Sequence, residues 1–336
     1  MLKLLSICIP TYNRCDFLVE NLKSLMPQLR NHAEIIEVLI NDNASNDHTP
    51  EIISELSGKY GWCIDIKVNT ENIGFRNNFN DIIKRSSGKY VFIMGDDDIL
   101  SPNFIDIILP ILEEDRYSLI HFNRIVGNGK CTMNKLHDIR FSGLNESMNF
   151  DAFIKRVMSS PNFISSIIFK RNIWENGQQF DNPERYFGYE WLARLYFGSK
   201  TNDKCLYYYM PLVIMRNPNR TWMKFGFLYM MIGMYNIFND MDKTIPGLKR
   251  QWNHRIRNTH FYDFHVMLND IAKDRTLYRR YRDNIYDICV SRLERLMVRI
   301  LLDFPVAKLV SFSYPKFLKL YRILSNAYIL HRRTEF

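Results

Sequence analysis

Four short apolar segments in the first hundred residues constrain the fold most, because each has the length of a β-strand and ends in a polar or glycine-containing turn. They are Leu4–Ile9, Ile36–Ile40, Ile64–Val68 and Tyr90–Met94. Helix signals lie between and after them: Thr49-Pro50-Glu51 offers an N-cap, a first-turn proline and an acid, and Ser101-Pro102 repeats the pattern. Strands that alternate with helices predict βαβ units, an α/β fold and a mostly parallel sheet.

This fold class directs attention to the residues that follow each strand. In open α/β sheets, ligands bind outside the carboxyl ends of the strands. The turns at those ends are Pro10–Arg14, Asn41–Ser45, Asn69–Asn78 and Gly95–Asp98, and three of the four carry clusters of Asp or Asn. The sequence therefore predicts a polar binding site at this edge of the sheet.

Beyond about residue 120 the pattern predicts further strands at Ser118–Phe122 and Phe163–Phe169 and a helix over Glu184–Gly198. From Thr221 onward the chain is apolar, aromatic and basic with helical spacing. In Ile285–Leu301 one apolar stripe is expected, flanked by arginines; its members are Ile285, Ile288, Cys289, Leu293, Leu296, Met297 and Ile300. We expect a catalytic domain over residues 1–222 and a helical, basic region over 223–336.

The net charge of +9 lies mainly in the tail, where residues 270–336 hold 14 Lys and Arg against 7 Asp and Glu. This asymmetry indicates an anionic partner: phospholipid, a lipid diphosphate or nucleic acid. The arginine-flanked stripe could pack on the catalytic domain, form a homodimer, or lie on anionic lipid. The longest uncharged stretch, Phe225–Phe238, has 14 residues against the ~20 that span a bilayer. With no signal peptide evident and no disulfide pattern among six scattered cysteines, we expect a cytoplasmic protein, peripheral at the membrane.

The strongest chemical signal is Gly95-Asp96-Asp97-Asp98, directly after an apolar strand. Three adjacent carboxylates repel one another, so a purely structural reason for them is hard to find. In an extended segment Asp96 and Asp98 project to the same side, which makes both candidate ligands for Mg²⁺ or Mn²⁺. The alternative is an acidic turn that caps the next helix.

The motifs C-I-P-T-Y-N-R, N-D-N-A-S-N-D-H-T, N-x-G-F-x-N-N and G-D-D-D occur in this order, each at a strand end. Together they resemble glycosyltransferase family 2, whose members have the Rossmann-like GT-A fold. The resemblance is close over the first 125 residues and weaker to about residue 222. Within the family the chain is similar to bacterial O-antigen sugar transferases, including the abequosyltransferase-like group that uses CDP-dideoxyhexoses.

The resemblance implies roles for the strand-end residues. The first turn would shape the nucleobase pocket and reach a phosphate, through Pro10, Thr11, Tyr12 and Arg14. Later turns would line the nucleotide, through Asp42, Asn72, Gly74, Arg76 and Asn78. In the triplet, Asp98 would hold the metal, Asp96 would face the ribose or sugar, and Asp97 would support them. Ordinary turn chemistry is the alternative for the Asp42 and Asn72 turns, since these residue types dominate turns.

Two further motifs bear on catalysis. The family's Glu-Asp pair at the start of a helix is Tyr189-Glu190 here, so Glu190 is the candidate base; a surface helix glutamate paired with Arg194 is the alternative. If the enzyme retains configuration, Glu190 need not be a base. The segment Arg216–Trp222 resembles the loop that closes over the diphosphate, with Arg216 and Arg220 as phosphate ligands, or it is a solvated basic loop. It is not the Q-x-x-R-W of processive synthases, which favours transfer of one sugar.

These features predict a metal-dependent transfer from a nucleoside-diphosphate sugar to a lipid-linked oligosaccharide in O-antigen or surface polysaccharide synthesis. A nucleotidyltransferase is disfavoured because Leu4–Arg14 contains no glycine to cradle a triphosphate. A non-enzymatic nucleic-acid-binding protein is disfavoured because no recognised nucleic-acid motif accompanies the basic residues, so no nucleic acid partner is expected.

Overall fold

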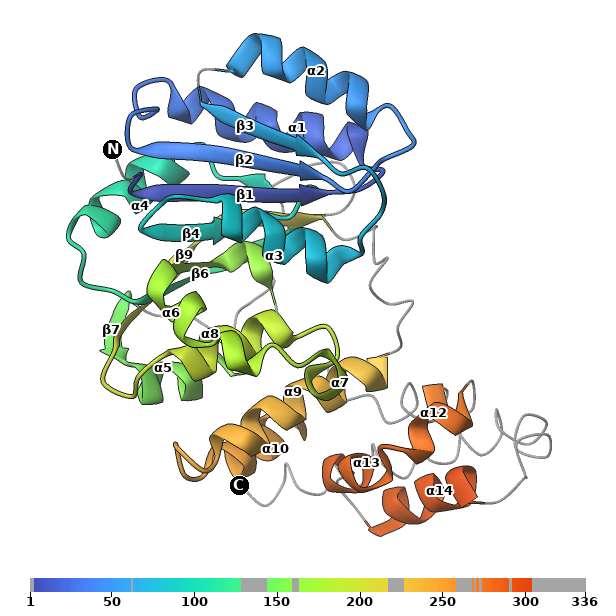
Figure 1. The fold of residues 1–336 in the computed structure, drawn as a ribbon. Helices are drawn as coiled ribbons and strands as arrows, with labels where there is room; N and C mark the ends of the chain where they lie inside the picture. The colour runs from blue at the N-terminus through green and yellow to red at the C-terminus, as the bar shows by residue number, and fades with distance from the viewer. Residues whose placement is uncertain are drawn as a thin grey trace. The chain divides into compact units, whose positions relative to one another are not determined.

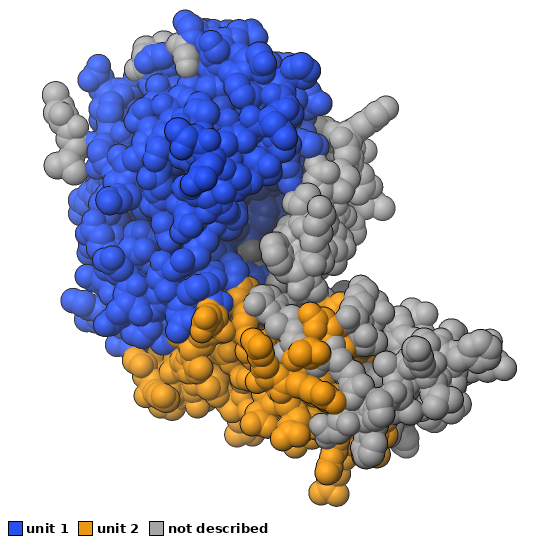
Figure 2. Space-filling view, turned by 45° about the vertical axis from the view of Figure 1, so that its right-hand side comes forward, with its two compact units in different colours: residues 1–183, 188–221 blue, residues 184–187, 222–336 orange. Residues whose placement is uncertain are grey.

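The computed structural model describes residues 3–61, 63–127, 144–158, 163–216, 227–257, 268, 270–271, 274–289 and 292–303. The chain forms two compact units. Unit 1 comprises residues 1–183 and 188–221, and unit 2 comprises residues 184–187 and 222–336; Figure 2 colours them blue and orange. Unit 1 contains the sheet, and unit 2 is helical in its described residues.

Within the described residues, unit 1 is built on one nine-stranded sheet with the order β3-β2-β1-β4-β8-β6-β9-β5, and β7 pairs with β9 (Figure 1). The strands are β1 (Leu5–Thr11), β2 (Ile36–Asp42), β3 (Ile64–Val68), β4 (Tyr90–Ile93), β5 (Ile99–Leu100), β6 (Leu119–Gly127), β7 (Glu146–Asn149), β8 (Ile167–Lys170) and β9 (Lys204–Arg216).

The first four strands form the parallel half of the sheet, as predicted. β1 lies between β2 and β4, with Leu5 opposite both Ile36 and Tyr90, and β3 extends the sheet beyond β2. Their carboxyl ends therefore meet at one edge, to which the arrowheads of β1, β2 and β3 point in Figure 1.

The second half of the sheet is mixed. β8 runs antiparallel to both β4 and β6, β6 pairs with β9 in parallel, and β5 and β7 run antiparallel to β9. β9 runs in the same direction as β4, and β5 runs antiparallel to β9. The chain must therefore reverse between β4 and β5. That reversal takes place in the acidic segment Gly95–Asp98.

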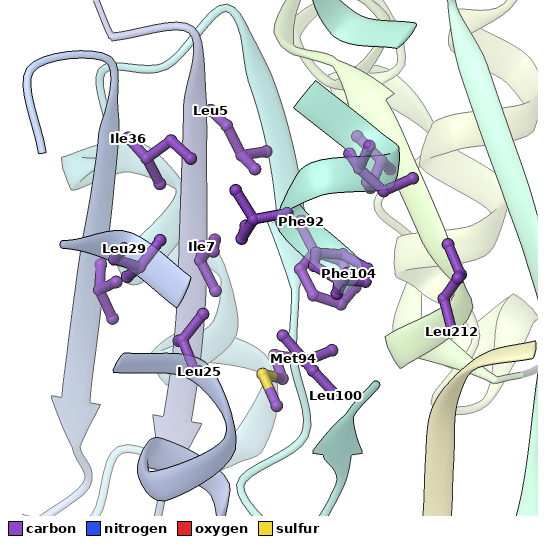
Figure 3. Packing of buried hydrophobic residues seen from close by; sticks show 14 of the residues in the cluster. Leu5, Ile7, Leu25, Leu29, Ile36, Phe92, Met94, Leu100, Phe104 and Leu212 are labelled. Atoms are coloured by element: carbon purple, nitrogen blue, oxygen red, sulfur yellow. The ribbon is translucent and has the colours of Figure 1, made fainter. Parts of the chain in front are cut away.

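Side chains alternate between the two faces of each strand, and helices pack on both faces of the sheet. Leu5, Ile7 and Ile9 of β1 belong to one buried cluster with residues of α1 (Cys15–Leu25), the 3₁₀ helix η1 (Met26–Leu29) and α4 (Phe104–Glu113). Figure 3 shows Phe104 against Phe92, with ring centroids 5.2 Å apart. Each such buried side chain stabilises the fold by about 1.5–3 kcal/mol. α3 (Phe75–Arg85) packs against β1 and β2 on the other face of the sheet.

The remaining helices of unit 1 are α2 (Thr49–Tyr60), α5 (Phe150–Val157), α6 (Arg171–Asn176) and α8 (Glu190–Gly198), together with the 3₁₀ helices η3 (Ile164–Ser166) and η4 (Gln178–Phe180). Both predicted N-caps were misplaced. α2 begins at Thr49, with His48 as its N-cap, and α4 begins at Phe104, with Asn103 as its N-cap in place of Ser101. The single helix predicted over Glu184–Gly198 is also wrong. Phe187 and Gly188 have positive φ (45° and 82°), a conformation that ends α7 (Pro183–Tyr186) before α8 begins.

Among its described residues, unit 2 contains α7 from Glu184 onward, α9 (Phe227–Met241), α10 (Leu248–Arg257), α12 (Arg275–Arg279), α13 (Arg282–Ile288) and α14 (Arg292–Asp303). The predicted continuous stripe over Ile285–Leu301 is wrong in its second half: Leu296 and Ile300 are 52% and 38% exposed, and Val298 and Leu302 are buried. The chain leaves the helix at Cys289, and this break resets the helical phase. The described helices include none that is long and apolar enough to cross a membrane.

Candidate functional site

The acidic segment forms a tight turn at the carboxyl edge of the sheet. The amide of Asp98 donates to the carbonyl of Gly95 at 3.2 Å, and Asp96 and Asp97 occupy the turn between them. The expectation of an extended segment was wrong, because the chain must reverse here to place β5 antiparallel to β9. Alternation along a strand therefore does not determine where Asp96 and Asp98 point.

The three carboxylates contact three different parts of unit 1. The Thr11 hydroxyl donates to Asp96 Oδ2 at 2.8 Å, and Arg14 Nη1 lies 2.9 Å from Asp97 Oδ2. The Ser165 hydroxyl donates to Asp98 Oδ2 at 2.5 Å. Two of the partners, Thr11 and Arg14, were predicted site residues; Ser165 was not.

The backbone of the turn is held by α1 beneath it. Asn21 is fully buried, and its Nδ2 donates to the carbonyls of Gly95 at 2.8 Å and Asp98 at 2.9 Å. Neither Asn21 nor Ser165 belongs to a recognisable motif, and no sequence signal identified them. The turn that carries the acids is thus fixed at both ends by side chains that the sequence did not reveal.

Burial and mutual repulsion make the turn electrostatically strained. Burial, followed by the charge of Asp97, raises the pKa of Asp96 to about 7, although Arg14 and Thr11 act in the opposite direction. Burial is also the main cause that raises the pKa of Asp98 well above its usual range, with Asp97 contributing next. Negative charge is therefore in excess here, and a cation would relieve it.

The carboxylate donors suit a divalent cation whose shell is completed by a ligand. The described residues contain no group of three or more His, Cys, Asp or Glu side chains arranged to hold a metal ion. Mg²⁺, however, is usually bound through one or two carboxylates together with substrate phosphates and water. Asp98, which is buried, and Asp96, which is half-buried, fit that requirement.

Two arginines that are far apart in the sequence of unit 1 lie near this turn. Arg14 precedes α1 and Arg216 ends β9, and their guanidinium groups lie 5.6 and 5.3 Å from the centroid of the Phe17 ring. Arg216 also forms an ion pair with Glu20. Arg14 pairs with Asp97, and the backbone of Arg216 hydrogen-bonds Asp98, so both arginines lie at the acidic turn, where an anionic ligand would need positive charge. The second predicted phosphate ligand of this loop, Arg220, lies outside the described residues.

The asparagine-rich turns form a connected amide network. Asn72 Oδ1 accepts from Asn43 Nδ2 at 2.8 Å and from the amide of Gly74 at 2.9 Å. Asn78 is buried, and its Nδ2 donates to the carbonyl of Asn41. These contacts give Asn72 and Asn78 a structural role in joining the turns after β2 and β3. Gly74, at φ 80°, adopts the left-handed conformation that glycine permits.

The other predicted nucleotide residues lie in different environments. Asp42 is buried and accepts from the amide and hydroxyl of Ser45, and burial raises its pKa. Arg76 is ion-paired with Asp181 at 3.1 Å. Pro10 lies in β1, and Tyr12 is 41% exposed directly after it, so the tyrosine ring remains open to a ligand.

Glu190 is a buried carboxylate at the start of α8. Its Oε1 accepts from the amide of Gly188 at 3.1 Å. The expected alternative, a surface ion pair with Arg194, is not formed: the Arg194 guanidinium lies 4.0 Å from the Trp174 ring centroid and Nε donates to the Trp174 carbonyl.

Comparisons with known proteins agree on the family. Residues 6–171 match the model of glycosyl transferase family 2. The chain is 28% identical to abequosyltransferase RfbV of Salmonella typhimurium over 263 residues, which are 74% of this chain and 78% of that protein. It is 31% identical to an uncharacterized glycosyltransferase of Rickettsia bellii over 144 residues, 41% of this chain and 19% of that protein.

Two solved structures have the same fold. S. aureus TarS 1–349, in complex with UDP-GlcNAc, aligns with a TM-score of 0.66 at 13% identity, covering 97% of this chain and 91% of that one. Mannosyltransferase PcManGT of Pyrobaculum calidifontis, in complex with GDP-Man and Mn²⁺, aligns with a TM-score of 0.52 at 13% identity, covering 92% and 86%. The chain is therefore a glycosyltransferase with the GT-A fold, and its residues 6–171 form a domain of glycosyltransferase family 2.

Proposed function

We propose that the chain transfers a single sugar from a nucleoside-diphosphate sugar, with Mg²⁺ or Mn²⁺, to a lipid-linked oligosaccharide of O-antigen or surface polysaccharide. The observation that carries this proposal is the acidic turn at the carboxyl edge of the sheet, flanked by Arg14 and Arg216. Carboxylates for a cation beside guanidinium groups for an anion suit a metal-bound diphosphate.

The donor we propose is a CDP-dideoxyhexose such as CDP-abequose. Support comes from the relative named abequosyltransferase, whose match spans most of both chains. TarS and PcManGT were solved with UDP-GlcNAc and GDP-Man, so a nucleoside-diphosphate sugar is common to these neighbours while the base differs. Residues at the ends of β1 and β2 would contact the base and ribose: Pro10, Thr11, Tyr12 and Asp42.

In this proposal Asp98 and Asp96 hold the cation, and Asp97 keeps Arg14 beside them. When bound, the cation would neutralise the negative charge that develops on the diphosphate leaving group. Arg14, Arg216 and Arg220 bind phosphate oxygens. Glu190, buried at the start of α8, takes the proton from the acceptor hydroxyl as the hydroxyl oxygen bonds to the anomeric carbon and the bond from that carbon to the diphosphate breaks.

We propose that residues 1–222 form the catalytic domain and that residues 223–336 contact the acceptor's membrane. Support comes from α14, where the exposed Leu296 and Ile300 share a helix with the exposed Arg292, Arg295 and Arg299. Apolar side chains flanked by arginines suit the surface of an anionic bilayer. We therefore place the protein peripherally at the inner face of the cytoplasmic membrane.

Replacement of Asp98 by alanine tests the catalytic proposal. With CDP-abequose, Mn²⁺ and a lipid-linked acceptor, Asp98→Ala should abolish release of CDP and formation of the extended glycan. Asp106→Ala is the matched control, because Asp106 is exposed on α4 and the change removes the same charge. Equal transfer rates for the parent protein and Asp98→Ala would refute the role of the acidic turn.

Vesicle flotation tests the membrane proposal. The parent protein should float with phosphatidylglycerol vesicles and not with phosphatidylcholine vesicles, and Leu296→Ser with Ile300→Ser should reduce flotation. Because both side chains are exposed, the substitutions should leave the unfolding temperature nearly unchanged. The parent protein could instead float with neither kind of vesicle and elute as a dimer that these substitutions disrupt. That result would show that the exposed side of α14 forms a homodimer interface.

A further inference from the structure

Ser165 joins the two ends of the acidic turn through one hydroxyl. It lies in η3, just before β8, and is fully buried. Its Oγ accepts from the amide of Gly95 at 2.8 Å and donates to Asp98 Oδ2 at 2.5 Å. The contact crosses 67 residues of sequence in the case of Asp98 and 70 in the case of Gly95.

The direction of these two hydrogen bonds is fixed by chemistry. A backbone N–H can only donate, so the Ser165 oxygen must accept from Gly95. A hydroxyl has a single proton, and Ser165 is left to direct it at the Asp98 carboxylate. The bond therefore orients one oxygen of Asp98. A carboxylate has about four lone-pair sites, so its remaining sites stay available to a cation.

We propose that Ser165 is a positioning residue for Asp98, holding the carboxylate in the orientation that binds the divalent cation of the donor complex. The inference rests on the proposed function, in which Asp98 is the metal ligand. Hydrogen-bond partners of metal ligands fix the ligand's orientation, and their loss typically weakens metal affinity about 10- to 100-fold.

The neighbouring residue provides a matched comparison. Ser166 is also fully buried, but its hydroxyl donates to the carbonyl of Phe163 at 2.7 Å and lies 3.4 Å from His121 Nε2. Neither of these two contacts reaches the acidic turn. Removal of either hydroxyl thus perturbs the same buried segment, and only removal of the Ser165 hydroxyl takes a hydrogen bond from Asp98, leaving its hydrogen bond to the backbone of Arg216.

The experiment measures Mn²⁺ binding by the full chain with CDP present, from the electron paramagnetic resonance signal of free Mn²⁺. Ser165→Ala should weaken Mn²⁺ affinity about 10- to 100-fold, whereas Ser166→Ala should stay within about twofold of the parent protein. Ser165→Thr keeps a hydroxyl and should recover part of the affinity. Thermal unfolding in EDTA should show shifts of similar size for both alanine variants.

Two results would overturn the inference, and they differ in meaning. If the parent protein binds Mn²⁺ but Ser165→Ala and Ser166→Ala bind it equally well, Ser165 has only a structural role and the proposed function stands. If the parent protein with CDP binds no Mn²⁺ saturably, the metal dependence is wrong, and the role of Ser165 fails with it.

Discussion

Replacement of Gly95 by alanine separates the position of the Asp98 carboxylate from the stability of the fold. A Cβ at residue 95 would lie 2.7 Å from Asp98 Oδ2 and 3.2 Å from Ser165 Oγ. The first distance is about 0.7 Å shorter than an ordinary contact of 3.4 Å. Gly95 has no left-handed φ, so its backbone accepts alanine. The flexible carboxylate is therefore expected to move, while the backbone stays.

Gly95→Ala is expected to lower both the stability of the fold and the rate of sugar transfer. Movement of Asp98 breaks its hydrogen bond to Ser165, which costs about 1.5–3 kcal/mol of unfolding free energy. Alanine restores about 0.4–1 kcal/mol by restricting the unfolded chain. A catalytic group displaced by about 1 Å can lower the rate on the order of 100-fold, or about 2.7 kcal/mol.

Gly88→Ala is the control with the opposite signature. Gly88 lies before β4, at the end of the strand opposite to Gly95, and a Cβ there would lie 2.5 Å from the backbone nitrogen of Ser6. Because backbone within β1 cannot yield cheaply, this variant should lose more stability and keep its specific activity.

Urea unfolding gives the stability of each variant, and kcat/KM for sugar transfer gives its activity. A kcat/KM of Gly95→Ala within about threefold of the parent value would show that the position of the Asp98 carboxylate does not matter for transfer. A Gly95→Ala protein as unstable as Gly88→Ala would show that the backbone, and not the carboxylate, had moved.

Three other substitutions have defined outcomes. Glu190→Gln keeps an oxygen for the backbone amide two residues earlier but cannot take a proton, so kcat should fall about 10²- to 10⁴-fold at an unchanged unfolding temperature; a rate near the parent's would exclude the base assignment. The pKa of Asp96 is raised from 3.8 to about 7, so between these pH values the folded protein keeps a proton that the unfolded chain releases. The Asp96 carboxyl therefore lowers the free energy of unfolding progressively as pH rises from about 4 to about 7. In EDTA, the unfolding temperature of Asp96→Asn should therefore exceed that of the parent by an amount that grows from pH 4 to pH 8. A difference that does not depend on pH would contradict this. Lys170 and then Lys89 lower the pKa of Asp115 to about 2, so its stabilisation is complete above pH 4 and lost as pH falls toward 2. Asp115→Asn should lower the unfolding temperature at pH 7 and not at pH 2, and equal effects at both would rule out the ion pairs as the cause.

The first half of the fold could be predicted because its signals are local. A strand-length apolar run and the turn after it are properties of a few neighbouring residues, and they placed β1 to β4 and the acidic turn at one sheet edge. The strand predicted over Phe163–Phe169 was placed less well, since its first part is the 3₁₀ helix η3 and the strand begins at Ile167. Helix ends were missed at Phe187 and Gly188, where left-handed backbone stops the chain without any break in apolar spacing.

By itself, the sequence determined that acids, amides and an arginine gather where parallel strands end, because side-chain type and strand direction are set locally. Only the tertiary structure decided what each acid contacts. Asn21 and Ser165 reach Asp98 across 77 and 67 residues, and Arg216 reaches Glu20 from the end of β9. These contacts depend on the order of strands in the sheet, in which β8 lies beside β4. Periodicity reports which face of an element is buried, and it carries no information about which distant element will cover that face.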